Sequence, residues 1–404
     1  MNTLKTKTVL VAIIGMFLAT VSLGQTWEIG YMNMTFVDAS RNNRQIETEL
    51  FYPTDVSGYN VPLGSPITKR YPVIVFGHDQ DISWNNYAHL WNKFATQGFI
   101  VAVPKTEMGP SMDVVEFAKD LAFIANEFKL MRYQPGSFFF DRHNSKSCFM
   151  GHGIGGSAAT FAVQYHPLVN TLVSLAATET VPSSINAASF VSIPSLVIGG
   201  GLDCIAPIAT NQMPMFDNID SECKTFVNMI DATHCHFAQD AGLCANSQLV
   251  CPVSLNNWQF TVMNSNYLII SFLRYYMKSN APALDKFEWK LINKQGVWTY
   301  IFACSESAPR IAAESEMENT TGMSLFPNPV AEGSVLNLSV SSEESTHGTL
   351  LITNLIGQVV SKQEITFDDE EQLLTLQTEF LKSGHYMVSV ISAEGRMTKP
   401  LIVR

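Results

Sequence analysis

The hydrophobic pattern of residues 25–304 alternates between short apolar runs and longer segments with helical spacing. Continuous apolar runs predict buried strands at 73–76, 99–103, 147–150, 172–176 and 195–199. Helical spacing predicts helices at 87–97, 112–128, 157–165 and 264–277. Because strands and helices alternate along the chain, we expect an α/β fold with a mostly parallel sheet and helices on both faces. Residues 28–36 and 44–52 read as antiparallel edge strands.

The C-terminal residues 324–404 follow a different pattern. Strand-like runs alternate with glycine turns and predict a small all-β sandwich, with strands at 335–340, 349–353, 359–365 and 386–391. Residues 305–323 are rich in Ser, Glu, Ala, Pro and Asn and lack apolar periodicity, which indicates a linker. The chain therefore divides into an α/β domain at 25–304, a linker at 305–323 and a β domain at 324–404.

The N-terminal residues 1–24 are typical of a signal peptide. Lys5 and Lys7 precede a short apolar run at 8–21, and small residues follow at 22–24. A membrane anchor is the alternative, but the run is shorter than the roughly 20 apolar residues that span a bilayer. We therefore expect an exported protein that begins at Gln25.

Composition narrows the classes of partner. The chain of 404 residues is 46% hydrophobic and 15% charged, which is enough for a large core. Its net charge is -11, and such an acidic balance argues against nucleic acid as a main partner.

A glycine-rich turn at 148–157 carries the strongest chemical signal. Its frame of Gly151, His152, Gly155 and Gly156 matches the G-x-S-x-G nucleophile elbow between a strand and a helix. The serine position of this frame is occupied by Gly153. Glycine adopts the strained backbone of the turn easily, but it has no hydroxyl for nucleophilic attack. The fold should survive this change, whereas catalysis by a serine should not.

Two further segments complete the pattern of a catalytic triad. Asp203 lies in a loop after the strand at 195–199, and His234 follows the strand at 224–230. The order elbow, acid, histidine is that of α/β-hydrolases, in which the acid orients the imidazole and the histidine accepts the serine proton. Backbone N–H groups of Gln80 and Ile154 are the expected oxyanion donors.

Each triad segment also has a simpler interpretation. Alone, Asp203 would be a loop cap and His234 a polar surface residue, and His236 competes with His234 for the role of base. The run His234-Cys235-His236 suggests zinc, but the hydrolase order and an oxidising compartment explain it better. We therefore expect no metal and no cofactor.

All seven cysteines lie between Cys148 and Cys304. Cys148 lies in a predicted core strand and is expected to be a buried thiol. The other six allow 15 pairings. The ends of the strand at 224–230 lie roughly 20 Å apart, and Cys204 and Cys235 both follow carboxyl ends of strands. We therefore expect the disulfides Cys204–Cys235 and Cys244–Cys251, which leaves Cys223–Cys304.

The α/β segment resembles secreted hydrolases of the dienelactone-hydrolase and cutinase-like group. Within it, the segments 71–78, 98–101, 150–156, 203–207 and 234–238 most resemble Bacteroidota hydrolases that act on polyethylene terephthalate. The resemblance implies Asp203 as acid, His234 as base, and Gln80 and Ile154 as oxyanion donors. Gly153 departs from the family serine, and Asp79 replaces the glycine that usually follows His78. A carboxylate there would oppose an oxyanion if its side chain points inward.

The segment 324–404 resembles the sorting domain of type IX secretion through its motifs at 326–330, 354–359, 384–388 and 399–403. The resemblance implies contact with the outer-membrane secretion machinery, and then release or surface attachment. A carbohydrate-binding sandwich is the alternative, which the few aromatic residues disfavour.

Three functions are consistent with these patterns. The first is a secreted hydrolase-fold protein with a disabled site that still binds a hydrophobic or ester-like ligand or polymer. The second is an active esterase with another nucleophile, such as Ser157, His152 or an activated water. The third is a surface or adhesive protein with a relic pocket.

Overall fold

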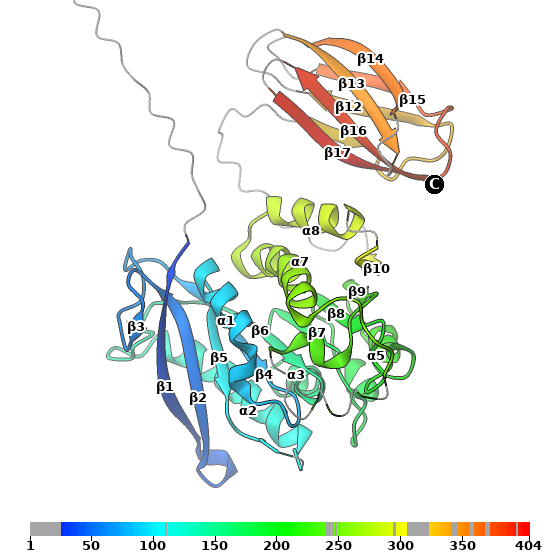
Figure 1. The fold of residues 1–404 in the computed structure, drawn as a ribbon. Helices are drawn as coiled ribbons and strands as arrows, with labels where there is room; N and C mark the ends of the chain where they lie inside the picture. The colour runs from blue at the N-terminus through cyan, green and yellow to red at the C-terminus, as the bar shows by residue number, and fades with distance from the viewer. Residues whose placement is uncertain are drawn as a thin grey trace, which may run out of the picture.

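The structure is a computed structural model that describes residues 26–404 except 110, 240–243, 245, 247–248, 250, 294–295, 305–322, 341–345, 355–358, 368–371 and 393–394. The expected signal peptide at 1–24 and nearly all of the expected linker at 305–323 lie outside the described residues. Within them, the chain forms one large α/β unit and one small β unit (Figure 1).

The α/β unit is built on a ten-stranded sheet in the order β10-β9-β8-β7-β6-β4-β5-β2-β1-β3. The six strands from β9 to β5 run parallel, whereas β2 and β10 pair with them antiparallel. This mostly parallel sheet confirms the α/β-hydrolase prediction, including the antiparallel edge strands near the start. The strands are β1 (Glu28–Asp38), β2 (Arg44–Thr54), β3 (Gly58–Tyr59), β4 (Tyr71–Gly77), β5 (Ile100–Pro104), β6 (His143–His152), β7 (Thr171–Leu175), β8 (Ser195–Gly200), β9 (Cys223–Met229) and β10 (Trp298–Cys304).

Helices cover both faces of the sheet because strand residues alternate between two hydrophobic cores. Val73 and Val75 of β4 pack into one core, and Ile74 and Phe76 into the other. Helices of the first core are α2 (Val114–Met131), α3 (Ile154–Tyr165), α4 (Ser184–Ala188) and α5 (Gln212–Asn218). Helices of the second are α1 (Ala88–Phe94), α7 (Trp258–Lys278) and α8 (Pro282–Asn293). Short 3-10 turns are η1 (Ala39–Arg41), η2 (Trp84–Tyr87), η3 (Ala95–Gln97), η4 (Ile208–Thr210) and η5 (His234–Phe237).

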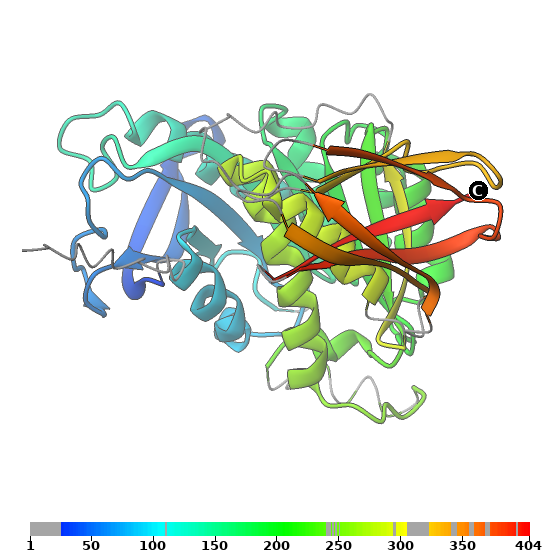
Figure 2. The same ribbon diagram turned by 90° about the horizontal axis from the view of Figure 1, so that it is seen from above.

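The long helix α7 crosses the sheet, and β1 and β2 lie at the end of the sheet remote from β9 (Figure 2). No helix among the described residues combines the length and apolarity that a membrane span requires.

The sequence pattern does not predict two elements that follow the helix expected at 264–277. α8 packs against α7, and β10 adds an edge strand beside β9. The strand was hard to predict because most of its residues remain partly exposed, so its apolar alternation is weak. Trp298 is the exception: it is buried and its indole N–H donates to the Leu291 carbonyl at 3.0 Å.

The C-terminal unit consists of two antiparallel sheets that share one core, as predicted. One sheet has the order β11-β12-β15 and the other β14-β13-β16-β17. Buried aliphatic residues such as Leu338, Leu350 and Val388 fill the space between the sheets. The strands are β11 (Met323–Phe326), β12 (Val335–Val340), β13 (Thr346–Asn354), β14 (Val359–Phe367), β15 (Gln372–Gln377), β16 (Gly384–Ser392) and β17 (Gly395–Val403).

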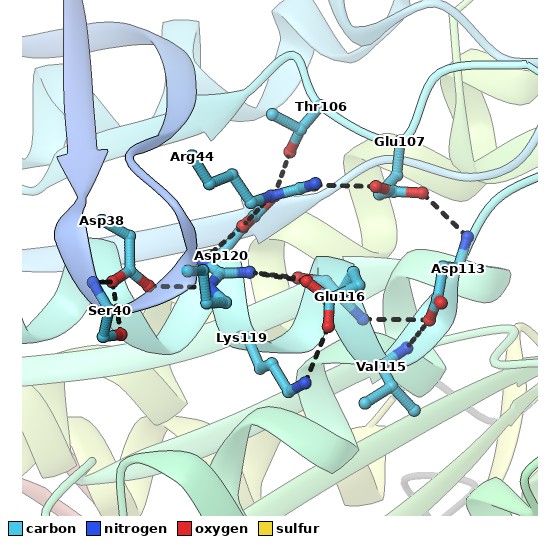
Figure 3. Close-up of polar contacts among 11 residues, drawn as sticks. Asp38, Ser40, Arg44, Thr106, Glu107, Asp113, Val115, Glu116, Lys119 and Asp120 are labelled. Atoms are coloured by element: carbon cyan, nitrogen blue, oxygen red, sulfur yellow. Dashed lines mark hydrogen bonds and ion pairs between the residues drawn. The ribbon is translucent and has the colours of Figure 1, made fainter.

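A buried carboxylate joins the edge strands to α2 (Figure 3). Asp120 is fully buried and accepts two hydrogen bonds from the Arg44 guanidinium, at 2.8 and 2.7 Å, and one from the Thr106 hydroxyl at 2.6 Å. Arg41 adds an ion pair at 2.6 Å without hydrogen-bond geometry. Glu107 accepts a hydrogen bond at 2.7 Å from Nη2 of Arg44, the nitrogen that also donates to Asp120. Two arginines thus compensate the buried charge and tie β2 to the helix.

The disulfides differ from two of the three expected pairs. Cys204 bonds to Cys251 and Cys235 bonds to Cys244, so the predicted pairs Cys204–Cys235 and Cys244–Cys251 are wrong. Cys204 and Cys235 do lie at the same edge of the sheet, but Cys251 and Cys244 also lie at that edge and each takes one of them as its partner. The pair Cys223–Cys304 is confirmed, because these residues face each other in the β9–β10 register. Cys148 is a buried free thiol, as expected.

Candidate active site

The residues that the sequence singled out meet at one edge of the sheet. Asp79 follows β4, Gly153 joins β6 to α3, Asp203 follows β8, and His234 begins η5 after β9. Because these strands are parallel, their carboxyl ends open onto the same side, where α/β proteins bind ligands.

Asp203 and His234 lie within hydrogen-bond distance of each other, as expected. The Nδ1 of His234 lies 2.7 Å from Oδ2 of Asp203, and both residues are buried. The other oxygen of Asp203 accepts the backbone N–H groups of Ile205 and Ala206 at 2.9 and 2.8 Å, which hold the carboxylate in place. His236, the competing histidine, lies outside this pair and lines a shallow depression with Thr233.

Gly153 adopts the strained backbone of a nucleophile elbow, with φ +55° and ψ -123°. A Cβ atom built on this residue would lie 2.0 Å from Oδ1 and 2.2 Å from Cγ of Asp79. Atoms cannot approach this closely, so a side chain at position 153 and the present Asp79 carboxylate exclude each other. The two departures from the hydrolase pattern are therefore physically coupled.

The Asp79 carboxylate contacts both groups that an active triad would use in the reaction, namely an oxyanion donor and the Nε2 atom of the histidine. Its Oδ1 accepts the Ile154 N–H at 2.8 Å, and this amide follows the nucleophile position and is the expected oxyanion donor. Its Oδ2 lies 3.2 Å from Nε2 of His234, which would otherwise face the serine hydroxyl. Burial opposes the charge on Asp79, but the hydrogen bond and charge of His234 leave its pKa below the ordinary value of 3.8.

A sequence profile described as PET hydrolase-like matches residues 29–251, which is more than half of the chain. The chain belongs to the PET hydrolase-like family. Residues 324–404 match the secretion system C-terminal sorting domain. The protein is therefore a type IX secretion substrate that is secreted or held at the cell surface.

Among curated proteins, this PET hydrolase-like chain is similar to cutinases of the genus Thermobifida. Cutinase 1 of Thermobifida cellulosilytica is 31% identical over 93 residues, which cover 22% of this chain and 34% of the cutinase. The cutinase of Thermobifida fusca is 31% identical over 93 residues, covering 22% and 29%. The chain thus spans only about a third of the length of these relatives.

A second network, which the sequence did not reveal, holds the PET hydrolase-like site together. The Asp79 N–H donates to the Tyr87 hydroxyl at 3.1 Å, and this hydroxyl lies 2.8 Å from Nδ1 of His152. The Nε2 of His152 lies 3.0 Å from the His234 carbonyl. Burial lowers the pKa of His152 to about 3, so the ring is neutral. Nε2 must then donate to the carbonyl, and Nδ1 accepts the Tyr87 proton.

His152 and His234, together with Asp79, also form a group whose side chains could be considered as metal ligands. Ligand atoms of Asp79, His152 and His234 lie within 4.8 Å of one another. Both ring nitrogens of each histidine already have hydrogen-bond partners. A metal ion would have to break these contacts, so the arrangement fits a hydrogen-bonded network better than a metal centre.

His234 lies between two carboxylates. Burial opposes its positive charge, but hydrogen bonds to Asp203 and Asp79 and the charges of both acids raise its pKa to about 10. The folded pKa lies above the ordinary value of 6.5. The contribution of this charge to stability is therefore complete below pH 6.5 and is lost as the pH rises through about 10.

We expect NMR of the imidazole nitrogens to find His234 protonated at pH 7. In Asp79→Asn its pKa should fall, because one of the two neighbouring negative charges is removed. His152, which should stay neutral in both proteins, serves as the internal reference. A neutral His234 at pH 7 in the unmodified protein would contradict the ion pair.

Proposed function

We propose that this secreted PET hydrolase-like protein does not hydrolyse esters through a serine intermediate, and that it binds a hydrophobic or ester-like ligand or polymer. The carrying observation is the Asp79 carboxylate, which fills the space of a side chain at position 153. Asp203 and His234 are the acid and base positions of the ancestral triad in this proposal, and Ile154 is an oxyanion donor. Gln80, in the turn after Asp79, remains a predicted second donor.

Three chemical arguments support the loss of acyl transfer. Gly153 has no nucleophilic oxygen. A protonated His234 cannot accept a proton, so it cannot act as the general base. A carboxylate on the Ile154 amide blocks that donor and would repel a developing oxyanion.

Other nucleophiles are poorly supported by the same contacts. Ser157 is fully buried one turn into α3, and its hydroxyl donates to the carbonyls of Thr178 and Gly153. The nitrogens of His152 are both engaged. An active esterase with either residue as nucleophile would first have to break these hydrogen bonds.

Exposed apolar residues beside the site support ligand binding. A depression of about 300 Å³ begins at Thr233, next to His234 in the chain. Leu249 and Val253 line it and are 82% and 88% exposed. Leu249 and Val253 are close in the chain to Cys244 and Cys251, which are bonded to Cys235 and Cys204 at the sheet edge. Exposed apolar side chains that are grouped together are typical of a surface that contacts another apolar surface.

We expect the unmodified protein to turn over short p-nitrophenyl esters no faster than the His234→Ala variant. Spontaneous hydrolysis sets the baseline of this assay. Turnover above the baseline that disappears in His234→Ala would contradict the loss of catalysis.

Binding is tested separately by partition onto polyester particles. Leu249→Asp with Val253→Asp should reduce the bound fraction several-fold, because both charges would enter the apolar contact. Ile67→Asp is the matched control, since Ile67 is 80% exposed but precedes β4, at the opposite end of the sheet from the site. Equal loss in both variants would contradict a specific binding surface.

A further inference from the structure

A second cavity lies away from the active site, between α1, α7 and α8. It holds about 760 Å³ and is lined by residues from all three helices and by Gln97. This volume is within the range of about 300–1,000 Å³ that small-molecule sites occupy. The helices belong to the second core, whereas the triad positions lie at the carboxyl ends of the strands. Nothing in the proposed function uses this cavity.

Three cations line the cavity, and no aspartate or glutamate is among its described lining residues. They are Lys93, Arg274 and Lys290. Arg274 donates to the Gln97 side-chain carbonyl, and Lys290 donates to the Tyr267 carbonyl and to the Ser271 hydroxyl at 2.7 Å. All of these partners are neutral. A concentration of uncompensated positive charge is unexpected in a chain whose net charge is -11.

Lys290 shows that the positive charges of this cavity are destabilised. Its side chain is only 7% exposed, and its ammonium lies 3.5 Å from the centre of the Tyr267 ring. Burial, together with the nearby charges of Arg274, Lys286 and Lys93, lowers its pKa to about 8. A bound anion would relieve the repulsion among these cations.

The cavity also offers apolar surface and buried polar atoms without partners. Met263, Tyr267 and Trp289 line it and are 61%, 40% and 43% exposed. Asn266 is 5% exposed and lines the cavity, and its side-chain oxygen has no hydrogen-bond partner. The Nδ1 of His89 is likewise buried without one. Buried polar atoms are normally paired, so both atoms are available for hydrogen bonds with a ligand in the cavity.

We propose that this cavity binds a small organic anion with an apolar body, of the class of fatty or aromatic carboxylates. The carboxylate would contact Arg274 and Lys93, and the apolar body would lie against Tyr267 and Trp289. Charge-assisted hydrogen bonds supply the preference for an anion, and burial of the apolar body supplies much of the affinity. The site is separate from the proposed polymer-binding surface.

Calorimetry on the full secreted chain tests the proposal with octanoate and benzoate as probes. We expect at least one of them to bind with a stoichiometry of one. Octanol, which lacks the charge, and inorganic phosphate, which lacks the apolar body, should each bind at least about tenfold more weakly. Equal binding of octanol or of phosphate, or no binding of either carboxylate, would overturn the proposal.

Matched variants locate the site. Lys93→Gln with Arg274→Gln should weaken carboxylate binding at least about tenfold, because two charge-assisted contacts are lost. Lys119→Gln with Lys129→Gln removes the same charge from α2, on the other face of the sheet, at residues that do not line the cavity. This control should change the affinity less than about twofold. Unchanged affinity in the first double variant, or equal weakening by the control, would overturn the assignment. Tryptophan fluorescence and denaturation midpoints confirm that the variants are folded.

Discussion

The double variant Gly153→Ser with Asp79→Gly is expected to hydrolyse p-nitrophenyl esters, whereas Gly153→Ser alone should show little activity. From the sequence alone, the single change would be expected to restore part of the activity. The structure changes this expectation, because a Cβ at position 153 would lie 2.0 Å from Oδ1 of Asp79. Asp79→Gly removes the obstruction, frees the Ile154 N–H for an oxyanion, and removes the negative charge from Nε2 of His234.

The expected gain is large. Loss of a triad nucleophile costs on the order of 10⁶ in turnover, and a restored frame should recover several powers of ten of that. The same double variant with His234→Ala is the control, since an active triad requires the imidazole. A double variant that folds, keeps its polyester binding and shows no His234-dependent turnover would show that further parts of the site have been lost.

Removal of the Asp120 carboxylate is expected to give the largest loss of stability among single substitutions in the polar network. Asp120→Ala leaves Arg41 and Arg44 without their shared buried partner. Breaking a buried ion pair on one side costs about 3–5 kcal/mol. We expect about 3 kcal/mol, because both guanidinium groups retain some access to water and contacts with Glu116 and Glu107.

Chemical denaturation monitored by tryptophan fluorescence measures this loss. All six tryptophans lie between Trp27 and Trp298, so the signal reports on the α/β unit alone. Asp141→Ala is the matched control, because its ion pair with Arg70 is exposed on both sides and should contribute less than about 1 kcal/mol. A similar loss in both variants would argue against a special role for the buried carboxylate.

Much of the fold was predictable because it depends on patterns that are local in the chain. The apolar runs and helical spacing predicted the parallel sheet, since each segment had to bury its own apolar residues. The β sandwich was visible for the same reason, in its alternating runs and glycine turns. The sequence pattern does not predict α8 and β10, because α8 buries only three apolar residues and β10 is an edge strand with a single buried residue, so neither gives a clear pattern.

The proposed triad positions can also be predicted from the sequence. The glycines around Gly153 identify the elbow, and chain order then points to Asp203 and His234. The sequence also drew attention to Asp79, as a replaced glycine beside the oxyanion loop. It could not show in which direction the carboxylate points.

The tertiary structure decided the features that depend on contacts between distant segments. Cys204 and Cys235 lie at one sheet edge, as expected, yet they bond to Cys251 and Cys244 and not to each other. The exclusion between Asp79 and a side chain at position 153 joins residues that are 74 positions apart. The relay from Asp79 through Tyr87 to His152 likewise has no sequence motif. Residue types indicate what chemistry each segment offers, but the distances that permit or block that chemistry arise only when the strands align their carboxyl ends.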